Sequence, residues 1–254
     1  MRISHLFILL AASAMLTACD FLDEYNPNSV TVGNYYTSEE DIVASLNGVY
    51  TSLTQSYVAD NYHYFTDVRA NATVVTNSGA NSGIPYQFYN YTLTEENVYV
   101  YNRYSQLYKI ISRANTLFAH LGDVSYATPS ARDTYEAEAR FLRAYFYFEL
   151  VKRYGGVPII GDKVYELNEN IELPRSTFEQ CIKYIVSELD DIKDDLRSLP
   201  LPDAAASAHV VNTQAAQALK IRVLLYAASP LFNEKPIESG NELIGYASYD
   251  RERW

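Results

Sequence analysis

The sequence predicts an all-α protein built from tetratricopeptide-like helical hairpins, with one long insertion rich in tyrosine and asparagine. Three observations support this fold class. Apolar residues recur at helical three/four spacing in several long stretches. Glycine and proline are scarce, at 10 and 9 of 254 residues, as suits a mainly helical chain. Ala137, Phe141 and Ala144 have the small–large–small spacing of the second helix of a tetratricopeptide repeat.

A first helix is expected from about Thr37 to Leu53. Thr37 or Ser38 can cap its start, and Glu40, three residues after Thr37, fits a capping box. The apolar positions that share one face are Ile42, Leu46, Val49, Tyr50 and Leu53.

The insertion runs from Tyr57 to Tyr99 and shows no sustained helical period. Gly79 and the Gly83-Ile84-Pro85 triplet interrupt it, and alternation over 73–76 allows small paired strands. A segment of this length without helices is usually either functional or disordered. Its many aromatic residues argue against disorder, so a functional surface is favoured.

Helical spacing returns near Val100 and predicts a helix over 100–121, followed by a longer helix over 129–154. Pro129 suits the first position of the second helix after a Thr128 cap, and Gly155-Gly156 suits its end. The expected buried face of that helix comprises Ala137, Phe141, Ala144, Tyr145, Phe148 and Val151. The i,i+4 pairs Glu136–Arg140 and Glu149–Arg153 are expected off that face.

Two further helices are predicted over 177–198 and 213–229, giving antiparallel pairs 100–121 with 129–154 and 177–198 with 213–229. Ser176 with Glu179 fits a capping box for the first, and Asn212 or Thr213 can start the second. Cys181 is interpreted as a small buried residue on a helix rather than a reactive thiol.

The N-terminus predicts a lipoprotein leader over residues 1–18. Arg2 precedes an apolar stretch, Leu6 to Leu16, that is too short to span a bilayer. Leu16-Thr17-Ala18-Cys19 then resembles a bacterial lipobox, which makes Cys19 the expected lipidation site. Residues 19–36 are interpreted as an acidic tether and 37–254 as the folded domain.

The composition excludes several function classes. A formal net charge of −11 and the lack of a basic stripe argue against nucleic acid. The acidic residues Glu188, Asp190, Asp191, Asp194 and Asp195 are interpreted as one solvated helix face rather than a catalytic pair. No histidine or cysteine set has metal-ligand spacing and no cofactor fingerprint is present, so we expect no enzyme, metal or cofactor.

The stretch from Arg140 to Pro158, RFLRAYFYFELVKRYGGVP, resembles the RagB/SusD family of Bacteroidota outer-membrane lipoproteins. Supporting stretches are CDFLD from Cys19, YKIISRAN from Tyr108 and ALKIRVLLYAASPLFN from Ala218. The resemblance implies a non-catalytic, cell-surface lipoprotein that binds oligosaccharides and delivers them to a TonB-dependent, SusC-like transporter barrel. It also implies that the chain corresponds to the N-terminal half of a typical member.

The resemblance and the composition together nominate glycan-binding residues in the insertion. Sugars need aromatic platforms for their C–H faces and polar side chains for their hydroxyl groups. The candidates are Arg69, Asn71, Tyr86, Tyr89 and Asn90. Two alternatives stay open: a lipid-anchored helical-repeat scaffold that binds only protein, and a lipid-anchored hydrolase.

Overall fold

The computed structural model describes residues 32–55, 87–88, 91–166, 168–198, 210–234, 238–250 and 252–253, which contain helices and no strand. The all-α prediction is confirmed. The chain divides into two compact units, Met1–Tyr35, which holds helix α2 (Val32–Tyr35), and Tyr36–Trp254. The second unit holds α3 (Glu39–Thr51), the short 3₁₀ helix η1 (Ser52–Thr54), α6 (Val98–His120), α7 (Ala131–Tyr154), α8 (Phe178–Asp191), α10 (Thr213–Ala227) and α11 (Pro230–Asn233).

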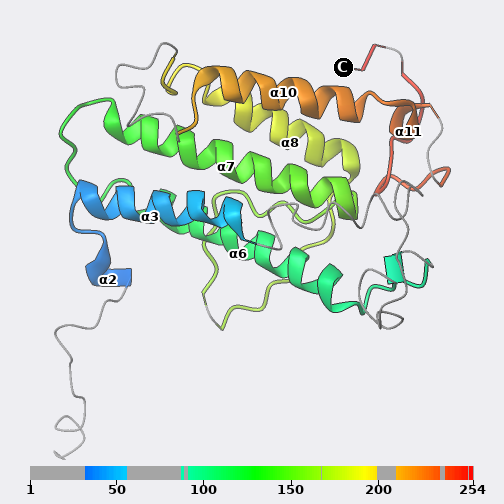
Figure 1. Cartoon of the computed structure of the whole chain (residues 1–254), viewed down its shortest axis with the longest axis horizontal. Coiled ribbons are helices and arrows are strands. Elements are labelled where there is room, and N and C mark those ends of the chain that lie inside the picture. Colours follow the sequence, from blue (N-terminus) through cyan, green and yellow to red (C-terminus); the bar gives the residue numbers. More distant parts are fainter. Residues whose placement is uncertain are drawn as a thin grey trace, which may run out of the picture. The chain divides into compact units, whose positions relative to one another are not determined.

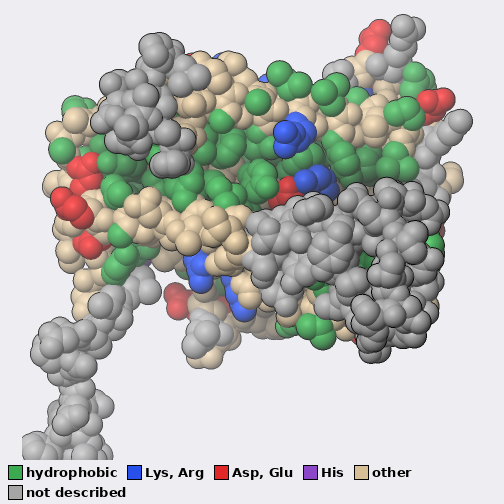
Figure 2. Space-filling view, viewed as in Figure 1, with side chains coloured by type: hydrophobic (Ala, Val, Ile, Leu, Met, Phe, Trp, Pro, Cys, Tyr) green, Lys and Arg blue, Asp and Glu red, His purple; other side chains and the backbone are tan. Residues whose placement is uncertain are grey.

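Helix α7 lies at the centre of the second unit, with α3 and α6 along one side and α8 and α10 along the other (Figure 1). Seen from the side of α3 and α10, hydrophobic side chains form a band over α7 between these two helices (Figure 2). One continuous hydrophobic core links α7 to all four neighbours. Because α7 contacts α3, α6, α8 and α10, its position determines where these four helices pack.

The pairing of α6 with α7 is antiparallel, as predicted. The Tyr154 hydroxyl donates to the Val100 carbonyl at 2.7 Å, near the start of α6 and the end of α7. Further along α6, Asn115 accepts a hydrogen bond from Arg143 at 2.8 Å. Residue numbers therefore fall along α7 as they rise along α6.

The second predicted pair, α8 with α10, is also antiparallel. Lys220 of α10 contacts Asp190 of α8 at 2.5 Å. Nearer the start of α10, the Thr213 hydroxyl donates to the Leu196 carbonyl beyond the end of α8 at 3.3 Å. Thr213 also joins the chain after α8 through its N–H, which donates to the Arg197 carbonyl at 3.0 Å.

The predicted buried face of α7 is correct in part. Phe148, Val151 and the two alanines are buried, but Phe141 and Tyr145 are only half-buried. The side chains of α7 that the prediction missed and that are at most 1 % exposed are Glu138, Ala139, Leu142, Arg143, Phe146, Tyr147 and Leu150. A helix surrounded by neighbours on several sides buries more than one face, so a single stripe describes it poorly.

Glu149 was expected off the buried face of α7 and is instead 4 % exposed. Its carboxylate lies 3.2 Å from Arg103 of α6 and 2.9 Å from Arg153, so the predicted i,i+4 pair forms but in a buried setting. The pair Glu136–Arg140 forms at 2.9 Å with both side chains partly exposed.

Two capping boxes were placed on the wrong residues. Helix α3 is capped by Ser38, whose N–H donates to the Asp41 carboxylate at 2.9 Å, so Glu40 has no part in the cap. Helix α8 is capped by Thr177, whose hydroxyl accepts from the Gln180 N–H at 3.1 Å. Ser38 is one of the two predicted caps of α3, and only its capping-box partner differs from the prediction. In α8 the capping residue lies one position after the predicted Ser176, because either neighbouring hydroxyl satisfies the same sequence pattern.

Two helix boundaries also differ from the prediction. Helix α7 begins at Ala131, not at Pro129, because the Ala131 N–H closes a turn on the Thr128 carbonyl at 3.2 Å before the helix starts. Helix α8 ends at Asp191, seven residues before position 198. Ile192 and Leu196 remain buried in the turns that follow, which is why the apolar period continues beyond the helix.

Gly155 and Gly156 end α7 where another segment crosses closely. Gly155 has φ 70°, a left-handed value that favours glycine. The Gly156 N–H donates to the Leu243 carbonyl at 2.5 Å, while a Cβ on Gly156 would lie 2.0 Å from the Ser176 carbonyl oxygen. The chain before α8 and the segment containing Leu243 therefore both pack directly on this glycine pair.

We expect Gly156→Ala to lower the free energy of unfolding by about 1–3 kcal/mol, because the added methyl group clashes with backbone that cannot move freely. Gly122→Ala is the matched control, since nothing lies within 4 Å of a Cβ at Gly122. Urea unfolding followed by circular dichroism measures both. Equal midpoints for the two variants would contradict the close packing at Gly156.

Candidate ligand-binding groove

The residues that the sequence nominated for lipidation and glycan binding lie outside the described residues. They are Cys19, Arg69, Asn71, Tyr86, Tyr89 and Asn90. The expected short strands over 73–76 lie outside them as well. The structure does describe two residues within the insertion, Gln87 and Phe88, and its final stretch from Tyr91 onward.

The end of the insertion is attached to the start of α6. Asn97 caps α6 by accepting a hydrogen bond from the Tyr99 N–H at 2.8 Å, and its amide donates to the Gln87 side chain. Phe88 packs edge-on against Tyr99, with ring centroids 5.8 Å apart. Tyr91 adopts φ 60°, which is uncommon for a residue with a side chain.

A buried ion pair fixes this part of α6 to α7. Arg103, 1 % exposed, lies 3.2 Å from the Glu149 carboxylate and donates to the Tyr99 hydroxyl at 3.0 Å. Lys152 and Arg153 lie 2.5 and 2.9 Å from the same carboxylate. The start of α6, where the insertion ends, is thus held in place by charge-assisted contacts.

A groove of about 580 Å³ lies along α6. One wall is α6 and the other is the connection between α7 and α8. The α6 residues are Tyr101, Tyr104, Ser105, Tyr108, Lys109 and Ser112, and the connection contributes Pro158, Ile160, Tyr165, Ile171 and Leu173. Its volume is within the range of small-molecule sites in proteins.

The α6 wall consists of two rows of side chains. The inner row, Tyr104 and Tyr108, is half-buried against α7. The outer row is Tyr101, Ser105, Lys109 and Ser112, spaced one helical turn apart. Within the part of the chain that the structure describes, no side chain of the outer row makes a hydrogen bond or ion pair, so its polar atoms are available to a ligand.

Contacts with neighbouring residues hold the tyrosines of the inner row. The Tyr108 hydroxyl donates to the Pro158 carbonyl at 2.6 Å, and burial raises the pKa of Tyr108, so it stays protonated as a donor. The Tyr104 ring lies 4.9 Å from that of Tyr108 and edge-on to Tyr154 at 5.1 Å. The floor of the groove is therefore rigid.

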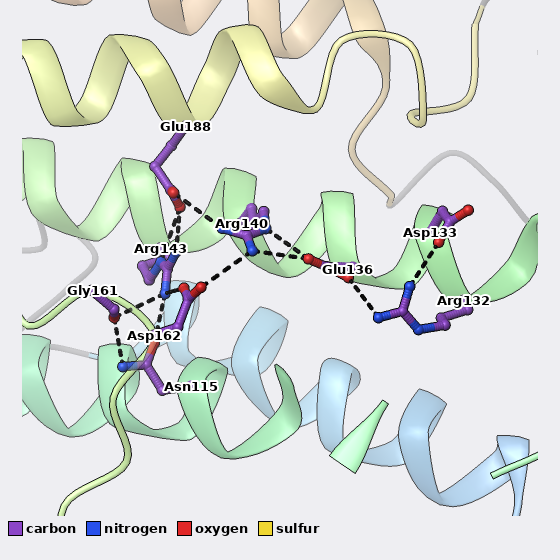
Figure 3. Close-up of polar contacts among 9 residues, drawn as sticks. All are labelled: Asn115, Arg132, Asp133, Glu136, Arg140, Arg143, Gly161, Asp162 and Glu188. Atoms are coloured by element: carbon purple, nitrogen blue, oxygen red, sulfur yellow. Dashed lines mark hydrogen bonds and ion pairs between the residues drawn. The ribbon is translucent and has the colours of Figure 1, made fainter. Parts of the chain in front are cut away.

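The opposite wall is held by a polar cluster centred on Asn115 and Arg143 (Figure 3). The Asn115 amide donates to the carbonyls of Gly161 and Lys163 at 2.8 and 2.9 Å. Arg143 donates to the Gly161 carbonyl at 3.0 Å and to the Asp162 carboxylate at 2.6 Å. These bonds fix the start of the α7–α8 connection, which then continues as the groove wall.

Arg143 also contacts Glu188 of α8, which lies 2.5 Å from its guanidinium and 3.1 Å from that of Arg140. Glu188 was expected on a solvated face but is 6 % exposed, because these two arginines meet it between α7 and α8. The other four acidic residues of that predicted face, Asp190, Asp191, Asp194 and Asp195, are exposed.

The arginines also influence Asp162 of the connection. Burial tends to raise the pKa of the Asp162 carboxyl, but hydrogen bonding and charge from Arg143 and Arg140 outweigh it and lower the pKa below 3.8. Because its pKa is lowered, the carboxylate stabilises the fold at pH values above the ordinary pKa of aspartate. This stabilisation is lost as the pH falls through the lowered pKa. At neutral pH the connection is therefore held by a charged group.

Sequence reasoning missed the groove for an identifiable reason. Tyr104 and Tyr108 share the three/four spacing of Leu107 and Ile111, so they look like part of the buried face of the helix, and the sequence of 161–173 shows no helical period. The available signal was the second stripe, Tyr101, Ser105 and Lys109, at four-residue spacing. Only the folded connection shows that this stripe faces a wall.

Two other features of the described residues bear on function. His120 stacks on Tyr36 at 4.2 Å and contacts Asp123 at 2.6 Å, and no group of three or more metal-ligating side chains occurs in the described ranges. Among the same residues, none of the helices combines the length and apolar character needed to span a bilayer. Cys181 is buried and free, as predicted, and burial raises the pKa of its thiol.

Antiparallel helical hairpins packed side by side define a helical-repeat protein, which here carries a tyrosine-lined groove. Residues 20–225 match the model of the SusD-like family, described as starch-binding and associating with the outer membrane. The chain therefore belongs to the SusD-like family, which confirms the resemblance found in the sequence. This is a family of carbohydrate-binding, non-catalytic proteins associated with the outer membrane.

Two curated relatives come from Formosa agariphila. SusD-like protein P38 is 25 % identical over 196 residues, covering 77 % of this chain and 38 % of the relative. SusD-like protein P2 is 24 % identical over 213 residues, covering 81 % and 41 %. The chain thus spans well under half the length of the curated relatives it matches.

Solved structures agree with this assignment. A laminarin-binding SusD-like protein is 26 % identical with a TM-score of 0.64, over 76 % of this chain and 41 % of that protein. A SusD-like protein from Bacteroides fragilis is 24 % identical with a TM-score of 0.62, over 76 % and 36 %. The second similarity concerns the fold alone.

We expect Glu188→Gln to lower the free energy of unfolding by about 3–5 kcal/mol, because it removes the buried carboxylate that pairs with Arg143 and leaves this buried cation with the exposed Asp162 as its remaining charged partner. Asp190→Asn, two residues further along the same helix, removes an exposed ion pair with Lys220 and is expected to cost at most about 1 kcal/mol. Chemical denaturation distinguishes them. A Glu188→Gln midpoint as high as that of Asp190→Asn would show that the cluster does not stabilise the fold.

Proposed function

We propose that this chain is a cell-surface glycan-binding lipoprotein that captures oligosaccharides and delivers them to a TonB-dependent, SusC-like outer-membrane transporter. The observation that carries the proposal is the family match over residues 20–225, which covers most of the chain. A structural relative that binds laminarin, at 26 % identity, supports a carbohydrate ligand. Because the matched part is less than half of each relative, the ligand and the partner remain proposals for the whole protein.

The glycan is proposed to contact the insertion, through Arg69, Asn71, Tyr86, Tyr89 and Asn90. Tyrosine rings can stack on the C–H faces of sugars, and guanidinium and amide groups can pair their hydroxyls. The described contacts of Asn97 and Arg103 support this location, because they hold the end of the insertion on a rigid helix pair.

Membrane attachment is proposed to occur through acylated Cys19. The leader preceding it has a short positive region, an apolar stretch and small residues before the cysteine. More than one acyl chain is needed for stable anchoring, since a single chain gives only marginal binding. A lipid anchor followed by the tether over 19–36 would keep the folded domain near a transporter in the same membrane.

We expect the double substitution Tyr86→Ala/Tyr89→Ala to abolish retention of the full chain in native gels that contain laminarin or starch, because both stacking platforms are lost. Tyr249→Ala is the matched control, since Tyr249 is a tyrosine 61 % exposed elsewhere on the surface. Reducing-end assays on the same mixtures test the hydrolase alternative. Unchanged mobility of the double variant would contradict the residue assignment, and reducing ends would contradict the function.

We expect Cys19→Ala to abolish labelling by radioactive palmitate and to move the protein out of the outer-membrane fraction, because the anchor cannot form. Cys181→Ala controls for loss of a cysteine, since Cys181 is buried and 1 % exposed. Labelling and fractionation of whole cells measure both. Persistent outer-membrane labelling in the Cys19→Ala variant would count against the proposed anchor, and protease shaving of intact cells reports on surface exposure.

A further inference from the structure

The described lining of the α6 groove shares no residue with the binding surface that the sequence nominated. These described lining residues belong to α6 and to the α7–α8 connection, whereas the nominated residues are within the insertion. It is nevertheless adjacent along the chain, because the insertion ends at the start of α6. Tyr101, which begins the outer row of the groove, lies one turn after the Asn97 cap.

The groove has the chemistry of a surface for a polar polymer. Among the described residues, each aromatic side chain that lines it is a tyrosine rather than a phenylalanine, so each of these rings carries a hydroxyl group. Tyr101 is 66 % exposed and presents its ring to solvent. Ile171 and Leu173, 53 % and 39 % exposed, supply apolar contact on the opposite wall.

Polar groups accompany the rings at every helical turn. From Tyr101 to Ser112 the outer row extends for roughly 16 Å at 1.5 Å per residue. Its phenol, hydroxyl and ammonium groups have no partners among the described residues, and a buried ligand hydroxyl needs such partners. A linear oligosaccharide alternates C–H faces with hydroxyl edges, which matches a row of rings beside a row of polar atoms.

Other ligand classes fit less well. The net charge of −11 disfavours a nucleic-acid ligand. In addition, the α6 wall offers a single exposed cation, Lys109, to neutralise phosphate groups. A peptide added as a strand needs an exposed sheet edge, and the described residues contain no strand. An amphipathic helix needs a continuous apolar floor, whereas Ser105, Lys109 and Ser112 interrupt this one.

We propose that the α6 groove, lined by Tyr101, Tyr104, Ser105, Tyr108 and Lys109, is a second oligosaccharide-contacting surface that binds the units of a chain beyond those held by the insertion. This rests on the proposed glycan-binding function. Tyr101 stacks on a sugar ring, Ser105 and Lys109 pair hydroxyl groups, and the fixed rings of Tyr104 and Tyr108 form the floor. The groove thereby selects long chains over short ones.

The test compares ligand lengths by calorimetry on the full chain, with laminaribiose and laminarihexaose, and with maltose and maltohexaose. We expect the hexasaccharide of at least one series to bind more tightly than its disaccharide. Tyr101→Ala and Lys109→Ala should each lower the affinity for the hexasaccharide by roughly three- to tenfold, while leaving the affinity for the disaccharide unchanged. Both side chains are exposed, so folding should be preserved, and Tyr249→Ala should match wild type.

Each outcome separates the groove from the proposed function. If the affinity for the hexasaccharide is unchanged in both groove variants, the proposed role of the groove is overturned. This holds even where Tyr86→Ala/Tyr89→Ala abolishes binding and so supports the proposed function. Equal loss for the disaccharide and the hexasaccharide would also overturn it, because the groove would then not serve distal units. A wild-type chain that binds none of these sugars, nor laminarin or starch in gels, would overturn both.

Discussion

The structure depends on Arg143, a fully buried cation in the middle of the central helix. Its guanidinium contacts Glu188 of α8, Asn115 of α6 and Asp162 of the α7–α8 connection, so one side chain joins three elements to α7. It also lies 4.7 Å from the ring centroid of Phe118, which covers part of its surface. Burial opposes the charged form, but Glu188 and the other acceptors raise the pKa of Arg143. A buried cation is tolerated here because its partners surround it.

This arrangement links the core to the surface groove. The hydrogen bonds of Asn115 and Arg143 fix the connection at Gly161, and the Tyr108 hydroxyl fixes it again at Pro158. Tyr147 adds a third attachment by accepting the Ile160 N–H at 3.0 Å. The wall opposite α6 is thus built from backbone held at three successive points. Because the frame is rigid before any ligand arrives, binding would cost little ordering of the protein.

The sequence was sufficient for the helices and insufficient for their environment. The period of the hydrophobic residues predicted every long helix of the described part of the chain, and both antiparallel pairs, since apolar spacing reports directly on local conformation. It failed for Glu149 and Glu188, because charged residues on α7 and α8 look solvated until the arginines opposite them, Arg103 and Arg143, are known. The capping box of α3 and the cap of α8 at Thr177 were missed by one residue, where neighbouring hydroxyls fit the pattern equally well. The groove forms between α6 and the α7–α8 connection, which are about 60 residues apart in the sequence. A local sequence pattern does not show that two such distant segments lie side by side.

The tyrosines of this chain perform two different tasks, and burial separates them. Tyr154 and Tyr126 have hydroxyls that donate to backbone carbonyls of Val100 and Leu121, so these residues fasten helix ends and loops. Such a tyrosine is already satisfied and has little to offer a ligand. Tyr101 differs, because its ring is exposed and its hydroxyl has no described partner. An abundance of tyrosine is therefore weak evidence for sugar binding, whereas an exposed ring beside free polar groups on a rigid helix is a specific one.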